Sequence, residues 1–376
     1  MQRTTPDRSI SWRSPFLVIF ALIFAGFWTV TGTLLVVDPL DLYAWGRPPQ
    51  LLDDYHRGDT AYLYSAVSRA ELDTLFIGSS TTAIFSSSDL QQAFPGARRA
   101  FNLSVSGPRP YDRALLSNLV LEHSPARHLL LAVDWFYVQP ARQAKPDVPV
   151  YLYDEDALND LRVASPTALR LLLRRLQGGP LALPGWDYAA SSHGDDEQRW
   201  RQFQRADKLA EIRRAVTATR DLLAADSNPR CSGYDALQLQ LLPFIRKASS
   251  QGRQLDLVIP PYSLAFYAVS ELQPRLGGHV LAHQLALRRC LVDAVDGLPG
   301  VRVYAFDDET WITGDLANYG DEGHIYNEAI KRYLLAAIAD GSHRLTRANI
   351  GEYVATLRAN VLNYEPHNSA LERAER

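Results

Sequence analysis

Five short apolar segments recur along the chain, and stretches with helical periodicity separate them. The apolar segments lie at residues 72–78, 99–105, 128–136, 255–261 and 301–306. The helical stretches between them lie at residues 110–123, 232–251 and 278–296. Short apolar runs that alternate with helices are typical of a parallel sheet covered on both faces. We therefore expect an α/β fold whose site lies at the carboxyl ends of the strands.

A longer apolar segment precedes this pattern. Residues 15–37 contain no charged side chain, and a helix of this length spans about 30 Å of hydrocarbon. A cleaved signal peptide is the alternative, but its apolar region is about 7 to 15 residues long and ends at a small-residue cleavage site. The segment is longer and leads into V-V-D-P-L-D without such a site. The sequence therefore predicts an uncleaved transmembrane anchor.

Charges on either side of residues 15–37 predict the orientation of this anchor. Arginines gather before the segment and aspartates after it: Arg3, Arg8 and Arg13, then Asp38, Asp41, Asp53 and Asp54. Under the positive-inside rule, residues 1–14 form a cytoplasmic tail. No later segment is long and apolar enough to cross back. We expect a single-pass protein of the inner (cytoplasmic) membrane whose main domain lies in the periplasm.

The remaining chain divides by composition and periodicity. Residues 38–70, rich in Pro, Asp and Tyr, are interpreted as a connector, and residues 71–345 as the α/β domain. Between the third and fourth predicted strands, residues from about 140 to 235 form an excess with helical stretches near 155–177 and 196–225. We interpret this excess as a helical insertion. Residues 346–376 are expected to form a C-terminal helix and tail.

Composition excludes several classes of function. A net charge of −3 offers no basic field for nucleic acid. No glycine-rich nucleotide motif is present, so we expect no cofactor. His279 and His283 lie four residues apart on a predicted helix, but no third ligand is near them, and we expect no metal. The only cysteines, Cys231 and Cys290, either form one disulfide in an oxidising compartment or stay as two buried thiols.

Two polar motifs follow the first two predicted strands. In F-I-G-S-S-T-T-A (76–83), Ser80 stands beyond a strand end, where backbone amides can approach its hydroxyl. Serines in such places are more commonly helix caps. In N-L-S-V-S-G-P-R-P (102–110), Gly107 can lend its amide to an oxyanion, or it is an ordinary turn glycine.

The third motif follows the last predicted strand. Asp321 and His324 lie three residues apart, just before an amphipathic segment that reads as a helix. This spacing allows the carboxylate to fix the tautomer of the imidazole and to support its positive charge. In the alternative interpretation, Asp321 caps the helix and His324 is a surface residue.

In this order the motifs resemble those of the SGNH, or GDSL-like, hydrolase superfamily. G-S-S (78–80) is similar to the family's first block, Gly107 to its second, and D-x-x-H (321–324) to its fourth. The resemblance implies a flavodoxin-like three-layer parallel sheet, with Ser80 as nucleophile, His324 as base and Asp321 orienting the base. It also implies a supporting part for Ser79, which stands in place of the family's aspartate.

One position departs from the family pattern. Where the third block has an asparagine, this chain has A-V-D-W, with Asp134 near that place. An ionised aspartate repels an oxyanion, whereas the asparagine amide donates to it. Three alternatives remain open: Asp134 is held protonated, it has another function, or the oxyanion hole consists of the backbone amides of Ser80 and Gly107.

Membrane-anchored members with a G-S-S or G-T-S block include alginate O-acetylation proteins and the D-alanyl-lipoteichoic acid biosynthesis protein, and the chain resembles this branch. The resemblance implies acyl transfer to an envelope glycan or exopolysaccharide, with a multi-pass membrane acyltransferase as partner. The alternatives are an envelope esterase or deacetylase, and a catalytically degenerate polysaccharide-binding or assembly protein. Trp186, Trp200 and Trp311 can stack on sugar rings or pack within the protein.

Overall fold

The computed structural model describes most of the α/β domain and the N-terminal helix. The longer described ranges are residues 15–38, 71–105, 107–139, 150–153, 197–225, 229–273 and 278–374. Shorter ones are residues 63–64, 67–68, 156, 159, 169, 172–173, 177 and 227. The described residues leave out the N-terminal tail that we expect in the cytoplasm (residues 1–14), most of the expected connector, Trp186 and most of the helical stretch expected at 155–177.

Six strands form one sheet in the order β2-β1-β3-β4-β5-β6. Their bounds are β1 (Thr74–Ile77), β2 (Ala100–Asn102), β3 (His128–Ala132), β4 (Gln254–Ile259), β5 (Val301–Ala305) and β6 (Arg344–Leu345). The pairings among β1 to β5 are parallel, and β6 is antiparallel to β5. The predicted α/β class is confirmed, since each expected strand segment contains all or most of one strand. The sixth strand was not expected.

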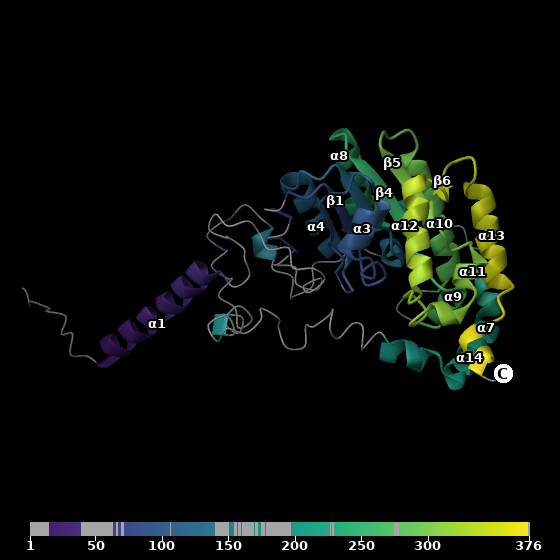
Figure 1. The fold of residues 1–376 in the computed structure, drawn as a ribbon, viewed down its shortest axis with the longest axis horizontal. Helices are drawn as coiled ribbons and strands as arrows, with labels where there is room; N and C mark the ends of the chain where they lie inside the picture. Colours follow the sequence, from purple (N-terminus) through teal and green to yellow (C-terminus); the bar gives the residue numbers. More distant parts are fainter. Residues whose placement is uncertain are drawn as a thin grey trace, which may run out of the picture.

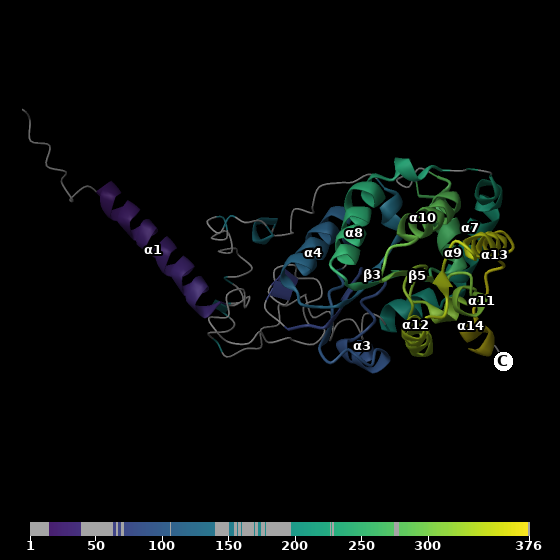
Figure 2. The same ribbon diagram turned by 90° about the horizontal axis from the view of Figure 1, so that it is seen from above.

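Helices cover both faces of the sheet. Figure 2 shows α4, α8 and α10 on one side of the strands and α3 and α12 on the other. Their bounds are α3 (Ser87–Ala93), α4 (Pro110–His123), α8 (Leu242–Ser250), α10 (Val280–Val295) and α12 (Glu328–Asp340). Because both faces are covered, every residue of β1 is buried. This burial accounts for the uninterrupted apolar run that predicted the strand.

Further helices extend the hydrophobic core beyond the sheet. They are α7 (Ala206–Ala224), α9 (Leu264–Glu271), α11 (Thr310–Thr313), α13 (Ile350–Leu362) and α14 (Ser369–Ala374). Val216 of α7 and Leu357 of α13 belong to the main core cluster. The C-terminal segment and the described end of the expected insertion are therefore packed parts of the domain.

The N-terminal helix α1 (Pro15–Val37) lies apart from the sheet and its covering helices (Figure 1). Its most apolar window has a mean hydropathy of 2.1 and is only 11% buried. By length and composition it can cross a membrane, although a signal sequence near the N-terminus meets the same criteria. The hydroxyls of Thr29 and Thr33 donate to carbonyls one turn earlier, at 2.7 Å each. These bonds satisfy two polar side chains within an apolar helix.

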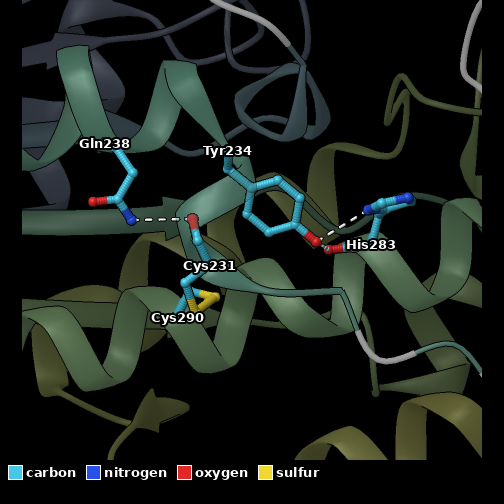
Figure 3. Close-up of a disulfide and its surroundings, with 5 residues drawn as sticks. All are labelled: Cys231, Tyr234, Gln238, His283 and Cys290. Carbon is cyan, nitrogen blue, oxygen red and sulfur yellow. Dashed lines mark hydrogen bonds between the residues drawn. A yellow bond between two sulfur atoms is a disulfide. The ribbon is translucent and has the colours of Figure 1, made fainter.

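A disulfide joins Cys231 to Cys290, with their Cα atoms 5.6 Å apart (Figure 3). It ties the short helix Cys231–Gly233 to α10. Next to it, the hydroxyl of Tyr234 lies 3.1 Å from Nδ1 of His283. Of the two alternatives that the sequence left open for the cysteines, the structure contains the disulfide.

Candidate active site

The polar residues expected from sequence meet at the carboxyl ends of neighbouring strands. Ser80 follows β1, and Asp134 follows β3, which pairs directly with β1. Strand β2 lies on the other side of β1, so the chain changes direction across the sheet at this point. Such a change opens a crevice at the strand ends, which is where open α/β sheets bind ligands.

Ser80, His324 and Asp321 form a continuous hydrogen-bonded chain. Oγ of Ser80 lies 2.8 Å from Nε2 of His324. Nδ1 of His324 lies 2.7 and 2.8 Å from the two carboxylate oxygens of Asp321. Because the carboxylate accepts the proton on Nδ1, the lone pair of Nε2 faces the serine hydroxyl. This is the tautomer that a general base requires.

The carboxyl group of Asp321 is held as an anion. Burial acts to raise its pKa, but hydrogen bonds from His324 and from the backbone amides of Gly323 and His324 outweigh burial, and the pKa is lowered. Both amides donate to Oδ1 at 2.9 Å. Helix α12 begins only at Glu328, and Asn327 is its N-cap residue. The alternative that Asp321 merely caps the helix is therefore wrong.

The loop that carries His324 is fixed to the rest of the domain. The amide of Gly320 donates to the carbonyl of His324 at 2.8 Å, which closes the loop at its base. The hydroxyl of Ser263, just beyond β4, donates to the carbonyl of Glu322 at 2.8 Å. These bonds hold the imidazole in place without help from a substrate.

Ser80 lies in a tight turn between β1 and α3. The amides of Thr82 and Ala83 both donate to the carbonyl of Ser79, at 3.1 and 3.0 Å. The amide of Ser79 donates in turn to the hydroxyl of Thr82, which packs over Gly78. Helix α3 begins only at residue 87. The turn, and not a helix N-terminus, therefore presents the amides near Ser80.

Asp134 is buried beneath this turn and is surrounded by donors. Its side chain is 1% exposed, and Oδ1 accepts from Ser79 Oγ at 3.0 Å, Thr81 Oγ1 at 2.9 Å and Tyr262 Oη at 3.1 Å. Its Oδ2 lies 2.8 Å from Nη2 of Arg113. These contacts occupy both oxygens of Asp134 with the turn, Tyr262 and Arg113. The geometry therefore favours the alternative in which Asp134 has another function.

Sequence analysis missed the two partners Arg113 and Tyr262. Arg113 lies on α4, is 2% exposed, donates to the carbonyl of Ala132, and stacks 4.8 Å from the ring centre of Phe136. Burial acts to lower its pKa, but Asp134 outweighs burial and the pKa is raised. Burial and then Asp134 raise the pKa of Tyr262 well above 10, so its hydroxyl remains a donor. No sequence signal marked either residue, because α4 (PYDRALLSNLVLEH) contains several other polar and charged side chains.

Two backbone amides are available for an oxyanion. The N–H groups of Ser80 and Gly107 have no hydrogen-bond acceptor among the described residues. Both residues line the same cavity. Gly107 has a φ of 51°, in the left-handed region that glycine adopts without strain. The alternative in which the oxyanion hole consists of backbone amides is consistent with this arrangement.

The cavity at the strand ends has a volume of about 520 Å³ and contains the triad. Its walls combine the aromatic side chains of Trp135 and Phe266 with the amides of Gln139 and Gln273. The sequence left open whether its tryptophans stack on sugar rings or pack within the protein, and the two of them that the structure describes lie outside this cavity. Trp200 donates to the carbonyl of Ala317 at 3.2 Å, and Trp311, 50% exposed, packs against Tyr333.

Within the described part of the chain, no three His, Cys, Asp or Glu side chains are placed to hold a metal ion. The imidazole of His283 is hydrogen-bonded to the hydroxyl of Tyr234, and the backbone amide of His279 donates to Glu271 at 2.6 Å.

Comparison of the sequence with protein-family models and with curated proteins found no match. The case for an activity therefore rests on the geometry of the site.

Proposed function

We propose that this chain is a membrane-anchored serine acyltransferase of the SGNH type, acting on an envelope glycan or exopolysaccharide. The observation that carries the proposal is the hydrogen-bonded chain from Ser80 through His324 to Asp321. This hydrogen-bonded chain lies at the carboxyl ends of the strands, where α/β proteins bind ligands. It lies in a cavity that is also lined by Ser80 and Gly107, whose amides have no acceptor among the described residues. Catalysis through a serine nucleophile needs each of these parts.

In the first half-reaction, His324 takes the proton of Ser80 while Oγ attacks the carbonyl carbon of an ester donor. The amides of Ser80 and Gly107 stabilise the tetrahedral oxyanion. Collapse breaks the bond to the donor's alkoxide, which leaves with the proton from His324. The acyl group remains as an ester on Ser80, and Asp321 stabilises the imidazolium throughout.

In the second half-reaction, a glycan hydroxyl enters and gives its proton to His324. Its oxygen attacks the acyl-serine carbonyl. When the tetrahedral intermediate collapses, the acyl group is transferred to the glycan and Ser80 regains its proton from His324. Water in place of the glycan would give an esterase or deacetylase with the same residues. The aromatic and amide side chains around the cavity suit a sugar, since aromatic faces pack on apolar surface and amides hydrogen-bond to hydroxyls, and the charged Arg109 and Glu322 line the same cavity.

Two features support a periplasmic location for the domain. Helix α1 is long and apolar enough to tether the chain, and arginines before it predict a cytoplasmic N-terminus. The Cys231–Cys290 disulfide is of a kind that persists in oxidising compartments. A multi-pass membrane acyltransferase would supply the acyl group across the membrane.

A reporter fusion tests the orientation. Alkaline phosphatase fused after residue 71 should be active in a bacterial host, because we expect that point to lie in the periplasm. Fluorescence of a cytoplasmic reporter fused at the same point would contradict the orientation.

Acyl-enzyme trapping tests the activity itself. The detergent-solubilised full chain is incubated with p-nitrophenyl acetate and examined by intact-mass spectrometry. Wild type should gain one acetyl group on Ser80, and Ser80→Ala should gain none. Ser79→Ala is the matched control, because it removes a neighbouring hydroxyl and keeps the nucleophile. An adduct that survives the loss of Ser80 would show that the mechanism is wrong, and no adduct on wild type would favour a binding or assembly protein.

Adding a soluble glycan to the acetylated enzyme separates the transferase from the esterase. A transferase should move the acetyl group to the glycan faster than to water. Release of free acetate at an unchanged rate, with no acetylated glycan, would favour the esterase.

A further inference from the structure

Three aspartates of the described chain are fully buried and paired with arginine. The pairs are Asp134 with Arg113, Asp256 with Arg302, and Asp307 with Arg288. A buried ion pair adds little to stability in itself, because burying both charges opposes their attraction. The pairs differ in the burial of the arginine, since Arg302 is 27% exposed whereas Arg113 and Arg288 are buried. They also differ in what else each carboxylate contacts.

Only one of these carboxylates is bonded to the turn that carries the nucleophile. Oδ1 of Asp134 accepts from Ser79 and Thr81, the residues on either side of Ser80. Asp256 lies in the first half of β4, away from the turn. Its carboxylate contacts the side chains of His128 at 2.7 Å and Gln254 at 3.2 Å. Asp307 accepts from Tyr267 at 2.8 Å and also from Tyr353.

The two hydrogen bonds that Asp134 accepts restrain Ser80 without any direct contact to it. The side-chain hydroxyls of the residue before Ser80 and of the residue after it are both held by one buried atom, Oδ1 of Asp134. A second link runs within the turn, where the amide of Thr81 donates to Ser79 Oγ at 3.2 Å. The freedom that remains at Ser80 is mainly rotation of its own hydroxyl, which His324 fixes. The same restraint also holds the Ser80 amide in the cavity wall.

Arg113 explains why this position is acidic. An asparagine at 134 could accept from Ser79 and Thr81 through its carbonyl oxygen, but its amino group would then face the guanidinium of Arg113. Two donors would meet, and the buried cation would lose its counter-charge, which is strongly destabilising. The negative charge of Asp134 balances the buried charge of Arg113, and its Oδ1 accepts the two hydrogen bonds from the turn.

We infer that Asp134, held by Arg113, is a positioning residue that fixes the Ser80 turn for nucleophilic attack. This inference rests on the proposed function, because it concerns the same serine. Asp134 is 1% exposed and lies at the base of the cavity, where its oxygens already contact Ser79, Thr81, Tyr262 and Arg113. Its loss should therefore lower kcat and leave KM nearly unchanged, whereas loss of a binding residue would raise KM.

The test measures the rate at which a fluorophosphonate labels Ser80 in the full chain, together with kcat and KM for p-nitrophenyl acetate. Asp134→Asn should lower the labelling rate and kcat by about 100-fold, the effect of a small misplacement of a reacting group. Asp256→Asn is the control, since it also deprives an arginine of its buried aspartate, away from the turn, although Arg302 is 27% exposed and Arg113 is buried. It should change both rates by less than about threefold, and thermal unfolding of both variants is measured alongside. Equal losses in the two variants would overturn the inference, and so would wild-type or higher activity in Asp134→Asn.

A double variant keeps the test decisive if Asp134→Asn folds poorly. In Arg113→Met with Asp134→Asn the buried charge is gone, and the asparagine oxygen can again accept from Ser79 and Thr81. This variant should recover at least about tenfold of the lost labelling rate, since it restores the positioning bonds. Failure to recover in a folded double variant would show that Oδ1 of residue 134 does not position the turn.

The same variants distinguish failure of this inference from failure of the proposed function. A wild type that is never labelled overturns the proposed function. The positioning role is then decided by nitrogen NMR of His324, which reports the hydrogen bond between Nε2 and Ser80 without any turnover. Asp134→Asn should shift the Nε2 resonance and Asp256→Asn should not. An unshifted resonance in Asp134→Asn would overturn the positioning role.

Discussion

Nε2 of His324 lies 2.8 Å from Oγ of Ser80, although 244 positions separate the two residues in the chain. Ser80 comes from the turn after β1, and His324 comes from the loop between β5 and α12. The two meet only when the whole parallel sheet has formed between them. The candidate site is therefore a property of the complete fold, and its residues should act as a unit.

Single and double changes in the triad should give non-additive losses. Ser80→Ala and His324→Ala should each lower kcat by about 10⁴-fold or more, and the double change should add less than about tenfold. Either residue alone is useless without its partner. Burst kinetics with p-nitrophenyl acetate measure the effect. Independent, multiplying losses would contradict a triad.

Asp321→Asn should reduce the activity and also cost some stability at neutral pH, because the pKa of Asp321 is lowered in the folded protein. The amide no longer accepts the proton on Nδ1 of His324, so the imidazole is free to adopt the wrong tautomer. An expected loss of about 10⁴-fold in kcat follows from the analogous change in serine proteases. Activity close to wild type would remove Asp321 from the mechanism.

Gly78→Ala should destabilise the fold by about 1 to 3 kcal/mol, the usual result of overpacking. A Cβ at this position would overlap the side-chain oxygens of Thr82 and Ser104. Gly96→Ala is the matched control, because a Cβ there meets no atom within 4 Å. Urea denaturation of the two variants measures the difference. A second change, Thr82→Ala, should relieve part of the loss, and equal midpoints for Gly78→Ala and Gly96→Ala would refute the close approach.

Asp308→Asn should stabilise the protein at alkaline pH and have little effect near pH 4. Burial, and then the neighbouring Asp307, raise the pKa of Asp308 to about 6. An acid whose folded pKa exceeds its unfolded value of about 3.9 favours folding when protonated, and this contribution is lost as the pH rises through the folded pKa. Thermal midpoints of both proteins between pH 4 and pH 8 test the expectation.

Asp315→Asn provides a comparison of opposite sign. Burial acts to raise the pKa of Asp315, but hydrogen bonds from Ser369 and Ala317 outweigh it, and the pKa is lowered. The stabilising contribution of Asp315 is therefore present above its unfolded pKa and is lost as the pH falls. Asp315→Asn should destabilise at pH 8 and become neutral in acid. Parallel pH profiles for the two variants would contradict both assignments.

Reduction of the disulfide should lower stability by about 4 kcal/mol, the chain-entropy value for a loop closed across a separation of 59 residues. Wild type treated with a reductant should unfold at a lower urea concentration. Cys231→Ser combined with Cys290→Ala should match reduced wild type and show no response to the reductant. A wild type that is also unresponsive would mean that the bond does not form.

The sheet could be predicted from sequence because its strands are buried on both faces. Each lies in a short, mostly apolar run, as in T-L-F-I of β1, although Asp256 interrupts the run in β4 and Arg302 that in β5. Helix α4 was predicted with its observed bounds, since Pro110 opens it and Pro125 follows it. Strand β6 has only two residues, one of them exposed, and no periodicity can reveal so short an element.

The candidate site divides in the same way. Ser80, Gly107, Asp321 and His324 lie in short motifs at strand ends, where spacing alone indicates chemistry. The surroundings of Asp134 are different, because Arg113 projects from a helix and Tyr262 follows another strand. Only the packing of α4 against the sheet brings the guanidinium to the carboxylate. Local patterns contain no trace of such a contact.

The two edges of the sheet are both very short: β2 has three residues and β6 has two. An exposed edge is a template on which another chain can add a strand, and long edges lead to aggregation. Here β6 runs antiparallel to β5 and covers only Val303 and Tyr304. Each edge strand itself therefore offers few backbone groups for a second copy to pair with. At high local concentration, neighbouring molecules should therefore resist edge-to-edge pairing of their sheets.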